Sequence, residues 1–395
     1  MVTRFEARQG LMSFREFMDL ALHDPEHGAY GAGVLEVGRD GDFVTSPSMG
    51  RDFAALLAVQ VCQWLDQLHA QCPDQILTLV EVGPGEGDLA ADLITEIERL
   101  APPWLALLRL ALVERNPGMA ERQRRRLAAS RWCCPLQWTS LEDLAAAPVH
   151  GVVLAHELLD AFPVERLVMR DGAMHQCVVQ LHTPSGQAPE LRWGDRALPE
   201  ALHHQLRWAA RACAITLPPV DAPEGWTTEW HTEVRPWLEN AAAAVASGVM
   251  LVIDYAHAAA RYYTAARPQG TLLAYRRQQA SPSLLENPGD CDLTAHLCLE
   301  TLIQQAAESG WGATGHCRQG EALLSLGLSH RLHSLQTLPS SRISEAFSRR
   351  EALLRLVDPA ALGSFYWLVF NRTGAPGPCS APPQSRCLEP PEPLS

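Results

Sequence analysis

Short apolar runs alternate along the chain with longer amphipathic stretches, and this pattern predicts strands that alternate with helices. The clearest example begins with the run 76–82, which predicts a buried strand. A glycine-rich turn follows, and residues 88–100 then carry leucine and isoleucine at helical spacing until Pro102 ends the segment. A strand, a glycine loop and a helix in this order begin the crossover unit of nucleotide-binding α/β domains.

Further apolar runs predict the other strands of one α/β sheet, and they lie at 108–114, 133–138, 151–155, 248–254, 311–317 and 364–370. The same pattern divides the chain into segments. We expect an N-terminal helical arm (1–75), the first half of a nucleotide-binding domain (76–163), an α+β insertion (164–247), a second half with a lid loop (248–372) and a disordered tail (373–395). Within the insertion, Asp171-Gly172 between two apolar runs predicts a β-hairpin.

The spacing of the glycines indicates which ligand the loop binds. They stand at the first, third and fifth positions of the turn: Gly83, Gly85 and Gly87. A dinucleotide fingerprint requires glycines at the first, third and sixth positions, and the sixth here is Asp88. Glu86 and Asp88 would repel a pyrophosphate but would attract a cationic ligand. The glycine spacing, with Glu81 before it, resembles motif I of class I S-adenosylmethionine (SAM) methyltransferases, whose ligand is a cation. The alternative is a structural glycine turn in another α/β domain.

Two acidic residues after predicted strands are further candidates for holding SAM. Glu114 stands at the carboxyl end of the second strand, where an acid can accept hydrogen bonds from both ribose hydroxyls, and a helix cap is the alternative. Asp143 stands at a position where methyltransferases often have an acidic residue that binds adenine. However, Ser140 and Asp143 also fit a capping box, which is the interpretation we favour.

The segment 42–47 precedes the glycine loop and contains Asp42, Thr45 and Pro47. It either lies over the cofactor and excludes water, or only folds the N-terminal arm. Ser46 can cap a helix and Pro47 can begin one, so we expect a helix to start here.

Composition excludes several functions. The net charge of −13 disfavours nucleic acid as the main partner, and no run of about 18 apolar residues predicts a membrane helix. The 32 basic residues are all arginine, so phosphate loops and Schiff-base chemistry that need a lysine are excluded. No apolar signal core opens the chain, so we expect a cytoplasmic protein. The 11 cysteines form no C-x-x-C pair, and we therefore expect free thiols and no structural metal.

Polar residues follow the fourth predicted strand directly: His156, Glu157 and Asp160. Ligands of open α/β sheets bind outside the carboxyl ends of the strands, so these side chains lie where chemistry would occur. An acidic cluster that merely starts a helix is the alternative.

Longer segments resemble the MidA-like family of class I SAM methyltransferases, which includes a mitochondrial complex I assembly factor that methylates arginine. The matching segments are 12–30, 41–47, 81–87, 157–163, 253–255, 270–272 and 292–296. The resemblance implies a Rossmann-like seven-stranded sheet, SAM as cofactor and a protein substrate with an accessible arginine. Three positions depart from the family pattern on the acceptor side: His156 replaces an asparagine, Ala256 a glycine and Leu273 an arginine.

If arginine is the acceptor, carboxylates can clamp its protonated guanidinium bidentately. We assign this role first to Glu157 and second to Asp254. His156 either accepts the released proton or acts as a structural donor. Two other functions remain open: a SAM-binding assembly protein with little catalysis, and a methyltransferase of small molecules. The insertion either presents the protein substrate or forms a homodimer surface.

Overall fold

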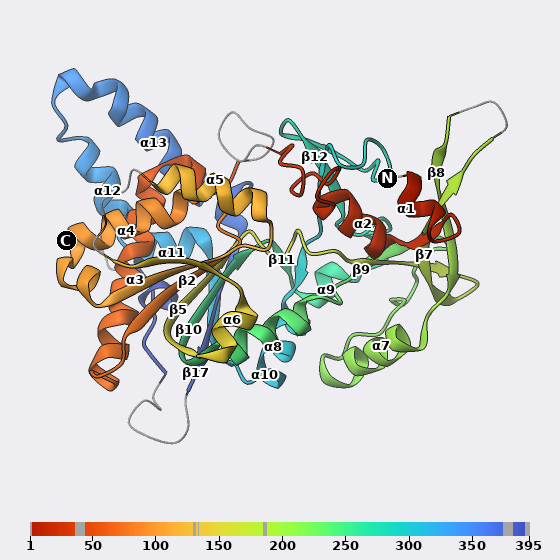
Figure 1. Ribbon diagram of the computed structural model, residues 1–395, viewed down its shortest axis with the longest axis horizontal. Coiled ribbons are helices and arrows are strands. Elements are labelled where there is room, and N and C mark those ends of the chain that lie inside the picture. The colour runs from red at the N-terminus through yellow and green to blue at the C-terminus, as the bar shows by residue number, and fades with distance from the viewer. Residues whose placement is uncertain are drawn as a thin grey trace. The chain divides into compact units, whose positions relative to one another are not determined.

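The computed structural model describes residues 2–35, 44–128, 132, 134–184, 188–373 and 382–391. The chain forms two compact units (Figure 1). The first, which we call the antiparallel unit, comprises Met1–Glu36, Leu159–Trp237 and Ala256–Gln305, and the second, the sheet unit, comprises Val37–Leu158, Leu238–Tyr255 and Ala306–Ser395. Residues of the expected N-terminal arm (1–75) fall in both units.

The sheet unit contains a seven-stranded sheet with the strand order β16-β17-β10-β5-β2-β3-β4. Four of these strands, β2, β5, β10 and β17, are labelled in Figure 1. Its strands are β2 (Leu77–Val82), β3 (Leu108–Val113), β4 (Leu136–Thr139), β5 (Val149–His156), β10 (Val245–Asp254), β16 (Gly312–Arg318) and β17 (Tyr366–Arg372). β17 is antiparallel to β10 and β16, and the other pairs are parallel. The predicted Rossmann-like seven-stranded sheet is confirmed.

Helices cover this sheet and build its core. They are α3 (Arg51–Gln71), α4 (Asp88–Leu100), α5 (Pro117–Leu127), α6 (Leu141–Ala146), α11 (Gln319–Ser325), α12 (Leu328–Leu335) and α13 (Ile343–Val357). Apolar side chains of α3, α4, α11 and α13 form one cluster with those of the central strands. β2 is buried at all six positions, which explains why its sequence is a continuous apolar run and does not alternate.

The start of α3 differs from the prediction. Ser46 and Pro47 begin only a 3-10 turn (Pro47–Met49), and the Ser46 side chain does not cap it. Gly50 then has a φ of 114°, which is incompatible with a continuous helix, so α3 begins at Arg51. Apolar side chains along α3, among them Phe53, Leu57 and Trp64, are buried.

The antiparallel unit is organised around a sheet in which β7 pairs with β1, β6 and β8. Its strands are β1 (Leu11–Ser13), β6 (Glu165–Arg170), β7 (Ala173–His182), β8 (Glu190–Ala197) and β9 (Thr227–Trp230), with short strands β11 (Ala256–His257), β12 (Leu273–Arg276), β13 (Gln279–Ser281), β14 (Asp292–Thr294) and β15 (Leu297–Cys298) outside it. β6 and β7 form the predicted hairpin. Asp171 and Gly172 have φ values of 49° and 77°, as a type I′ turn requires.

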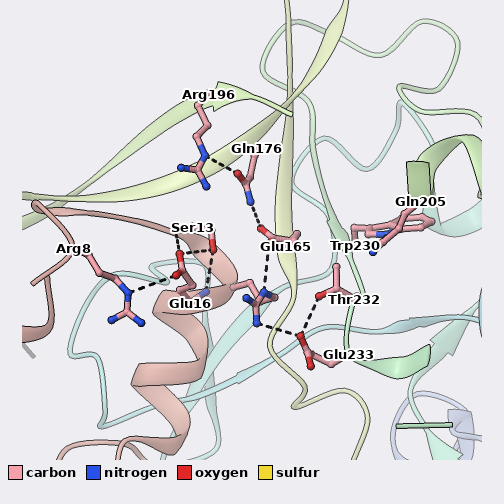
Figure 2. A network of polar contacts seen from close by, with 11 residues as sticks. Arg8, Ser13, Glu16, Glu165, Gln176, Arg196, Gln205, Trp230, Thr232 and Glu233 are labelled. Carbon is pink, nitrogen blue, oxygen red and sulfur yellow. Dashed lines mark hydrogen bonds and ion pairs between the residues drawn. The ribbon is translucent and has the colours of Figure 1, made fainter. Parts of the chain in front are cut away.

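The helices of this unit are α1 (Val2–Glu6), α2 (Phe14–His23), α7 (Glu200–Ala212) and α9 (Ala259–Tyr262), and the boundary between the units falls within α8 (Val234–Ala244) and α10 (Leu299–Glu308). A polar chain holds α2 on the sheet (Figure 2). Arg15 of α2 lies 3.4 Å from Oε1 of the buried Glu165, whose Oε2 accepts a hydrogen bond from Gln176 (2.8 Å), and Arg196 donates to Gln176 (2.7 Å). Burial raises the pKa of Glu165, which the donors from Gln176 and Arg15 partly offset.

Part of the expected disordered tail is ordered. Residues 382–391 carry a 3-10 turn, and Cys387 is buried. The N–H groups of Arg386 and Cys387 donate to Gln63 (3.1 Å) and Gln60 (2.8 Å) of α3. Composition missed this contact because it depends on two glutamines more than 300 residues away. The rest of the expected tail, 374–381 and 392–395, lies outside the described residues.

Three further observations concern cysteines, metals and membranes. Eight described cysteines are free thiols, but Cys72 is disulfide-bonded, so the expectation of free thiols is wrong at this position. Within the described ranges, no group of three or more His, Cys, Asp or Glu side chains could hold a metal ion. Among the helices of those ranges, none is both long and apolar enough to cross a membrane.

Candidate active site

The glycine loop joins β2 to α4, and each of its glycines has a positive φ: Gly83 68°, Gly85 53° and Gly87 86°. The N–H of Gly83 donates to the carbonyl of Val113 (3.0 Å), which holds the loop against the end of β3. A Cβ on Gly83 would lie 2.6 Å from Cδ1 of Leu158, whereas a Cβ on Gly85 would meet open space. A side chain at Gly83 would strain the backbone and displace the end of Leu158, while Gly85 leaves the backbone accessible to a ligand.

Glu81 lies inside β2 and is buried. Burial raises the pKa of its carboxyl to about 8, the charge of Asp88 adds to the rise, and a hydrogen bond from the backbone of Ala90 opposes it. The carboxyl is therefore largely protonated at neutral pH. A cationic ligand group nearby would favour its ionised form, because opposite charges lower the pKa of an acid.

Glu114 follows β3 directly and belongs to a network centred on Gln123 of α5. The N–H of Asn116 donates to Glu114 Oε1 (2.8 Å), and Gln123 donates to Glu114 Oε2 (3.1 Å) and to the carbonyl of Gly85 (2.7 Å). Trp138 donates to the amide oxygen of Gln123 (3.0 Å). Burial raises the pKa of Glu114, while these donors lower it. The carboxylate is thus tied to the glycine loop through one buried side chain.

The acidic residues of the loop are not isolated charges. Glu86 lies 3.3 Å from Arg122, and Asp88 forms an ion pair with Arg126, both on α5. Because each of these two carboxylates has a guanidinium partner, they would repel a pyrophosphate less than the sequence suggested. The case for SAM rests on the loop geometry and on Glu81 and Glu114.

The remaining candidate cofactor residues differ in their surroundings. Asp143 is exposed, and its N–H donates to the hydroxyl oxygen of Ser140 (3.0 Å), as the capping interpretation predicts. Thr45 is buried and exchanges hydrogen bonds with Ser48, and Pro47 begins the 3-10 turn. Asp42 lies outside the described residues.

Glu157 stands at the carboxyl edge of the sheet, directly after β5. Its φ of 47° is in the left-handed region, which costs a non-glycine residue about 1–3 kcal/mol. Its N–H donates to the carbonyl of Ile253 (2.8 Å), and its Oε1 accepts the N–H of Ser46 (3.1 Å). The structure thus fixes both the backbone and the carboxylate of Glu157, in a conformation that is retained only where the surroundings demand it.

His156 and Asp254 are the last residues of the neighbouring strands β5 and β10. Burial lowers the pKa of His156 to about 3, so its imidazole is neutral, and its ring packs edge-on against Phe53. Its Nε2 lies 3.3 Å from Oε1 of Glu157 and makes no hydrogen bond. Asp254 is fully buried, and its Oδ1 accepts the N–H of Tyr255 (2.8 Å).

Two residues of the site, Gln123 and Ser46, were not among the site residues predicted from the sequence. Gln123 stands alone among the arginines of 122–126, and that exception to a charged helix face was its one visible signal. Ser46 was noticed as a cap, but its N–H instead holds Glu157, while its hydroxyl contacts Gln319 (3.2 Å). No spacing rule connects residues 46 and 157, so only the fold brings them together.

The strand order, the positive-φ glycine loop after the first parallel strand and the acid after the second define a class I SAM methyltransferase. Residues 56–317 match the family model described as "Putative S-adenosyl-L-methionine-dependent methyltransferase". The chain therefore belongs to this family of SAM-dependent methyltransferases, and the family resemblance noted in the sequence is confirmed.

Two solved structures resemble this chain closely. A crystal structure from Burkholderia thailandensis with bound S-adenosyl-homocysteine aligns with a TM-score of 0.81 and 26% sequence identity, over 98% of this chain and 92% of that chain. A second crystal structure from the same organism aligns with a TM-score of 0.78 and 26% identity, over 96% and 91% of the two chains. The bound product in the first structure agrees with SAM as the cofactor.

Curated relatives come from animals. The Drosophila melanogaster protein arginine methyltransferase NDUFAF7 homolog is 25% identical over 90% of this chain and 80% of its own length. Protein arginine methyltransferase NDUFAF7 of Xenopus tropicalis is 26% identical over 82% and 74% of the two chains. Both names place those proteins in mitochondria, which contradicts our prediction of a cytoplasmic protein, and we withdraw that prediction.

Proposed function

We propose that this methyltransferase transfers a methyl group to an arginine side chain of a protein substrate. The relatives from Drosophila melanogaster and Xenopus tropicalis are named protein arginine methyltransferases. The observation in the chain itself that supports the proposal most is Glu157, a carboxylate fixed at the carboxyl edge of the parallel sheet, where ligands of such sheets bind.

We propose that Glu157 holds the acceptor guanidinium. A carboxylate can accept several hydrogen bonds, and the planar fork of a guanidinium matches its two oxygens. Because Ser46 and Ile253 hold Glu157 in place, little orientation has to be gained when the acceptor binds. Asp254, at the end of the adjacent strand, is the second candidate for this role.

His156 has a different proposed role from the one its residue type suggests. An imidazole with a pKa of about 3 is a poor proton acceptor at neutral pH. A neutral ring 3.3 Å from Glu157 Oε1 instead leaves the carboxylate its negative charge and limits its movement. We therefore propose His156 as a positioning residue for Glu157.

On the cofactor side we propose Glu81, Gly83, Gly85, Gly87 and Glu114 as the residues that hold SAM. SAM, when bound, supplies the electrophilic methyl group. Open space beside Gly85 and the carboxylate of Glu114, joined through Gln123, support this assignment. Asp42, Thr45, Pro47 and Asp143 stay weaker candidates, and a protein partner or homodimer surface in the insertion stays a prediction.

Labelled SAM tests the proposed function directly. The purified protein is incubated with labelled SAM and a lysate of cells that lack it, and labelled peptides are located by mass spectrometry. We expect methylated arginine with the wild-type chain and none with Glu157→Gln. Glu98→Gln is the matched control, because Glu98 is an exposed residue of α4 and its substitution removes the same charge.

The other results would reject the proposal in distinct ways. Label confined to low-mass compounds would identify a small-molecule methyltransferase. SAM binding without transfer to any component of the lysate would favour an assembly protein. Arginine methylation that persists in Glu157→Gln would retain the substrate class but reject Glu157 as the clamp.

A further inference from the structure

A second candidate site lies wholly within the antiparallel unit. A cavity of about 190 Å³ opens between β6 and the segment that leads into β12. Its polar lining residues are Arg166, Arg267, Gln269, Thr271 and His296, and Leu272 and Pro282 contribute apolar surface. None of these side chains has a role in the methyl transfer proposed above.

Strand β9 fixes the wall of this cavity through two residues that point to the same side of the strand. Thr227 donates from its N–H (2.9 Å) and its hydroxyl (3.2 Å) to the carbonyl of Pro268. Oε2 of the buried Glu229 accepts from the N–H of Thr271 (2.9 Å), from its hydroxyl (3.1 Å) and from Tyr262 (3.1 Å). The wall is therefore a preformed surface.

Gly270 makes this close approach possible. Its φ is 71°, and a Cβ at this position would lie 2.0 Å from Oε1 of Glu229. Any other residue would push the wall away from β9, because its Cβ would clash with the carboxylate of Glu229, so the position of the cavity depends on this glycine.

Two arginines of the cavity have no acidic partner. Arg166 donates to the hydroxyl of Thr227 (3.4 Å) and stacks on Trp193 (4.8 Å), while its Nε is buried without a partner. The guanidinium of Arg267 donates from Nε to the carbonyl of Arg261 (3.3 Å). Neither forms an ion pair with a described residue.

The neighbouring histidine does not change the sign of the charge in the cavity. Burial lowers the pKa of His296 to about 3, and His257 and Arg267 lower it further, so the imidazole is neutral. Glu229 lies behind the wall with one oxygen held by three hydrogen-bond donors. The cavity therefore offers two guanidiniums to a ligand.

We propose that this cavity binds a carboxylate, supplied by an acidic side chain of the protein substrate. Guanidiniums hold carboxylates with paired N–H groups, and the apolar surfaces of Leu272 and Pro282 suit the methylenes of a glutamate, which free phosphate lacks. The inference rests on the proposed function only for the source of the carboxylate. A protein substrate with an exposed glutamate would gain affinity from this site.

Binding of small probes tests the cavity without methyl transfer. The full-length protein is titrated with acetyl-Gly-Glu-Gly-amide, with acetyl-Gly-Gln-Gly-amide and with inorganic phosphate, and binding is followed by saturation-transfer NMR. We expect the glutamate probe to bind with a dissociation constant of roughly millimolar order. Arg166→Gln and Arg267→Gln should each weaken it at least about tenfold, since each removes hydrogen bonds to a charged group.

Matched variants make the result specific. Arg211→Gln removes the same charge from an exposed position on α7 and should bind the probe like the wild type. If Arg166→Gln fails to fold, Arg166→Lys and Arg267→Gln test the same site. Equal binding of the glutamine probe, or wild-type affinity in the two cavity variants, would overturn the proposal. Tighter binding of phosphate than of the glutamate probe would overturn the carboxylate assignment.

The outcome is separable from that of the proposed function, because the titration contains neither SAM nor an arginine acceptor. A protein that methylates no arginine could still bind the glutamate probe. Conversely, if the protein methylates arginine but its cavity variants bind the probe like the wild type, the proposed function would stand and the carboxylate site would be rejected.

Discussion

Glu114 follows β3 and Glu157 follows β5, which are two parallel strands of the same sheet, and the two carboxylates are held in different ways. Glu114 is fixed by Asn116 and Gln123, within nine residues of itself. Glu157 is fixed by Ser46, 111 residues away, and by Ile253, in a left-handed backbone conformation. The cofactor side of the site is thus built by one local crossover unit, whereas the acceptor side is assembled by distant parts of the chain.

This difference implies a division of effects between the two regions. A change beside the glycine loop should alter SAM affinity, because these residues face the proposed cofactor site. A change at Glu157 should alter the rate of methyl transfer and leave SAM affinity nearly unchanged. Four variants test this division, beginning with the largest expected effect.

Gly85→Val should abolish SAM binding. The branched side chain would fill the open space beside the loop and would also strain a φ of 53°, so we expect a loss of at least about a hundredfold in affinity, ~2.7 kcal/mol. Calorimetry measures the affinity. Gly172→Val is the control, because Gly172 also has a positive φ and open space, but lies in the β6–β7 turn. Unchanged SAM affinity in Gly85→Val would refute the loop assignment.

Glu157→Gln should slow methyl transfer by at least about a hundredfold, near 2.7 kcal/mol, because the amide keeps the shape and loses the charge that clamps a guanidinium. SAM affinity should stay within about threefold of wild type. Single-turnover rates and calorimetry separate the two quantities. Loss of SAM binding in this variant would assign Glu157 to the cofactor site, and the proposed division between Glu114 and Glu157 would be wrong.

Glu114→Ala should weaken SAM and S-adenosyl-homocysteine alike, by roughly 1.5–3 kcal/mol, since it removes hydrogen bonds to a charged group. Equal losses are expected because the two ligands share their ribose. Affinity equal to that of wild type would show that Glu114 only caps α5. Tighter binding of NADH than of SAM would reverse the choice of cofactor.

Glu81→Gln should change the pH dependence of stability. Burial raises the pKa of Glu81 in the folded chain to about 8, above the ordinary value of 4.5. The folded state then binds the proton more tightly, so the stabilisation is present below pH 4.5 and is lost as the pH rises to 8. The variant carries no proton to lose, and denaturation of the ligand-free protein should show a shallower slope over this range. A slope identical to that of wild type, as expected for Glu98→Gln, would contradict the buried proton.

Much of the sheet unit was predictable because its signals are local. The apolar run of β2, the three glycines and the face of α4 lie within 76–100, and the last two strands of the sheet followed from two further apolar runs. The hairpin at Asp171-Gly172 was predictable for the same reason, since a type I′ turn requires particular residues at two adjacent positions.

Predictions failed where a residue's partner lay far along the chain. Ser46 looked like a helix cap, yet the φ of Gly50 delays α3 and leaves the Ser46 N–H for Glu157. The tail looked disordered by composition, yet Cys387 is buried and bound to Gln60. His156 looked like a base, yet burial lowers its pKa to about 3, and burial is a property of the assembled core.

The sequence by itself determined the class of this protein, because a parallel strand, a glycine loop and a following acid are written within one continuous stretch, 76–114. Only the tertiary structure decided what surrounds the acceptor carboxylate and which of the described arginines form no ion pair. Apolar patterning specifies which residues are buried, and many hydrogen-bond arrangements are compatible with the same pattern. The one that forms depends on which of residues 46, 157 and 253, or 166, 227 and 268, the closed fold brings within about 3 Å of one another.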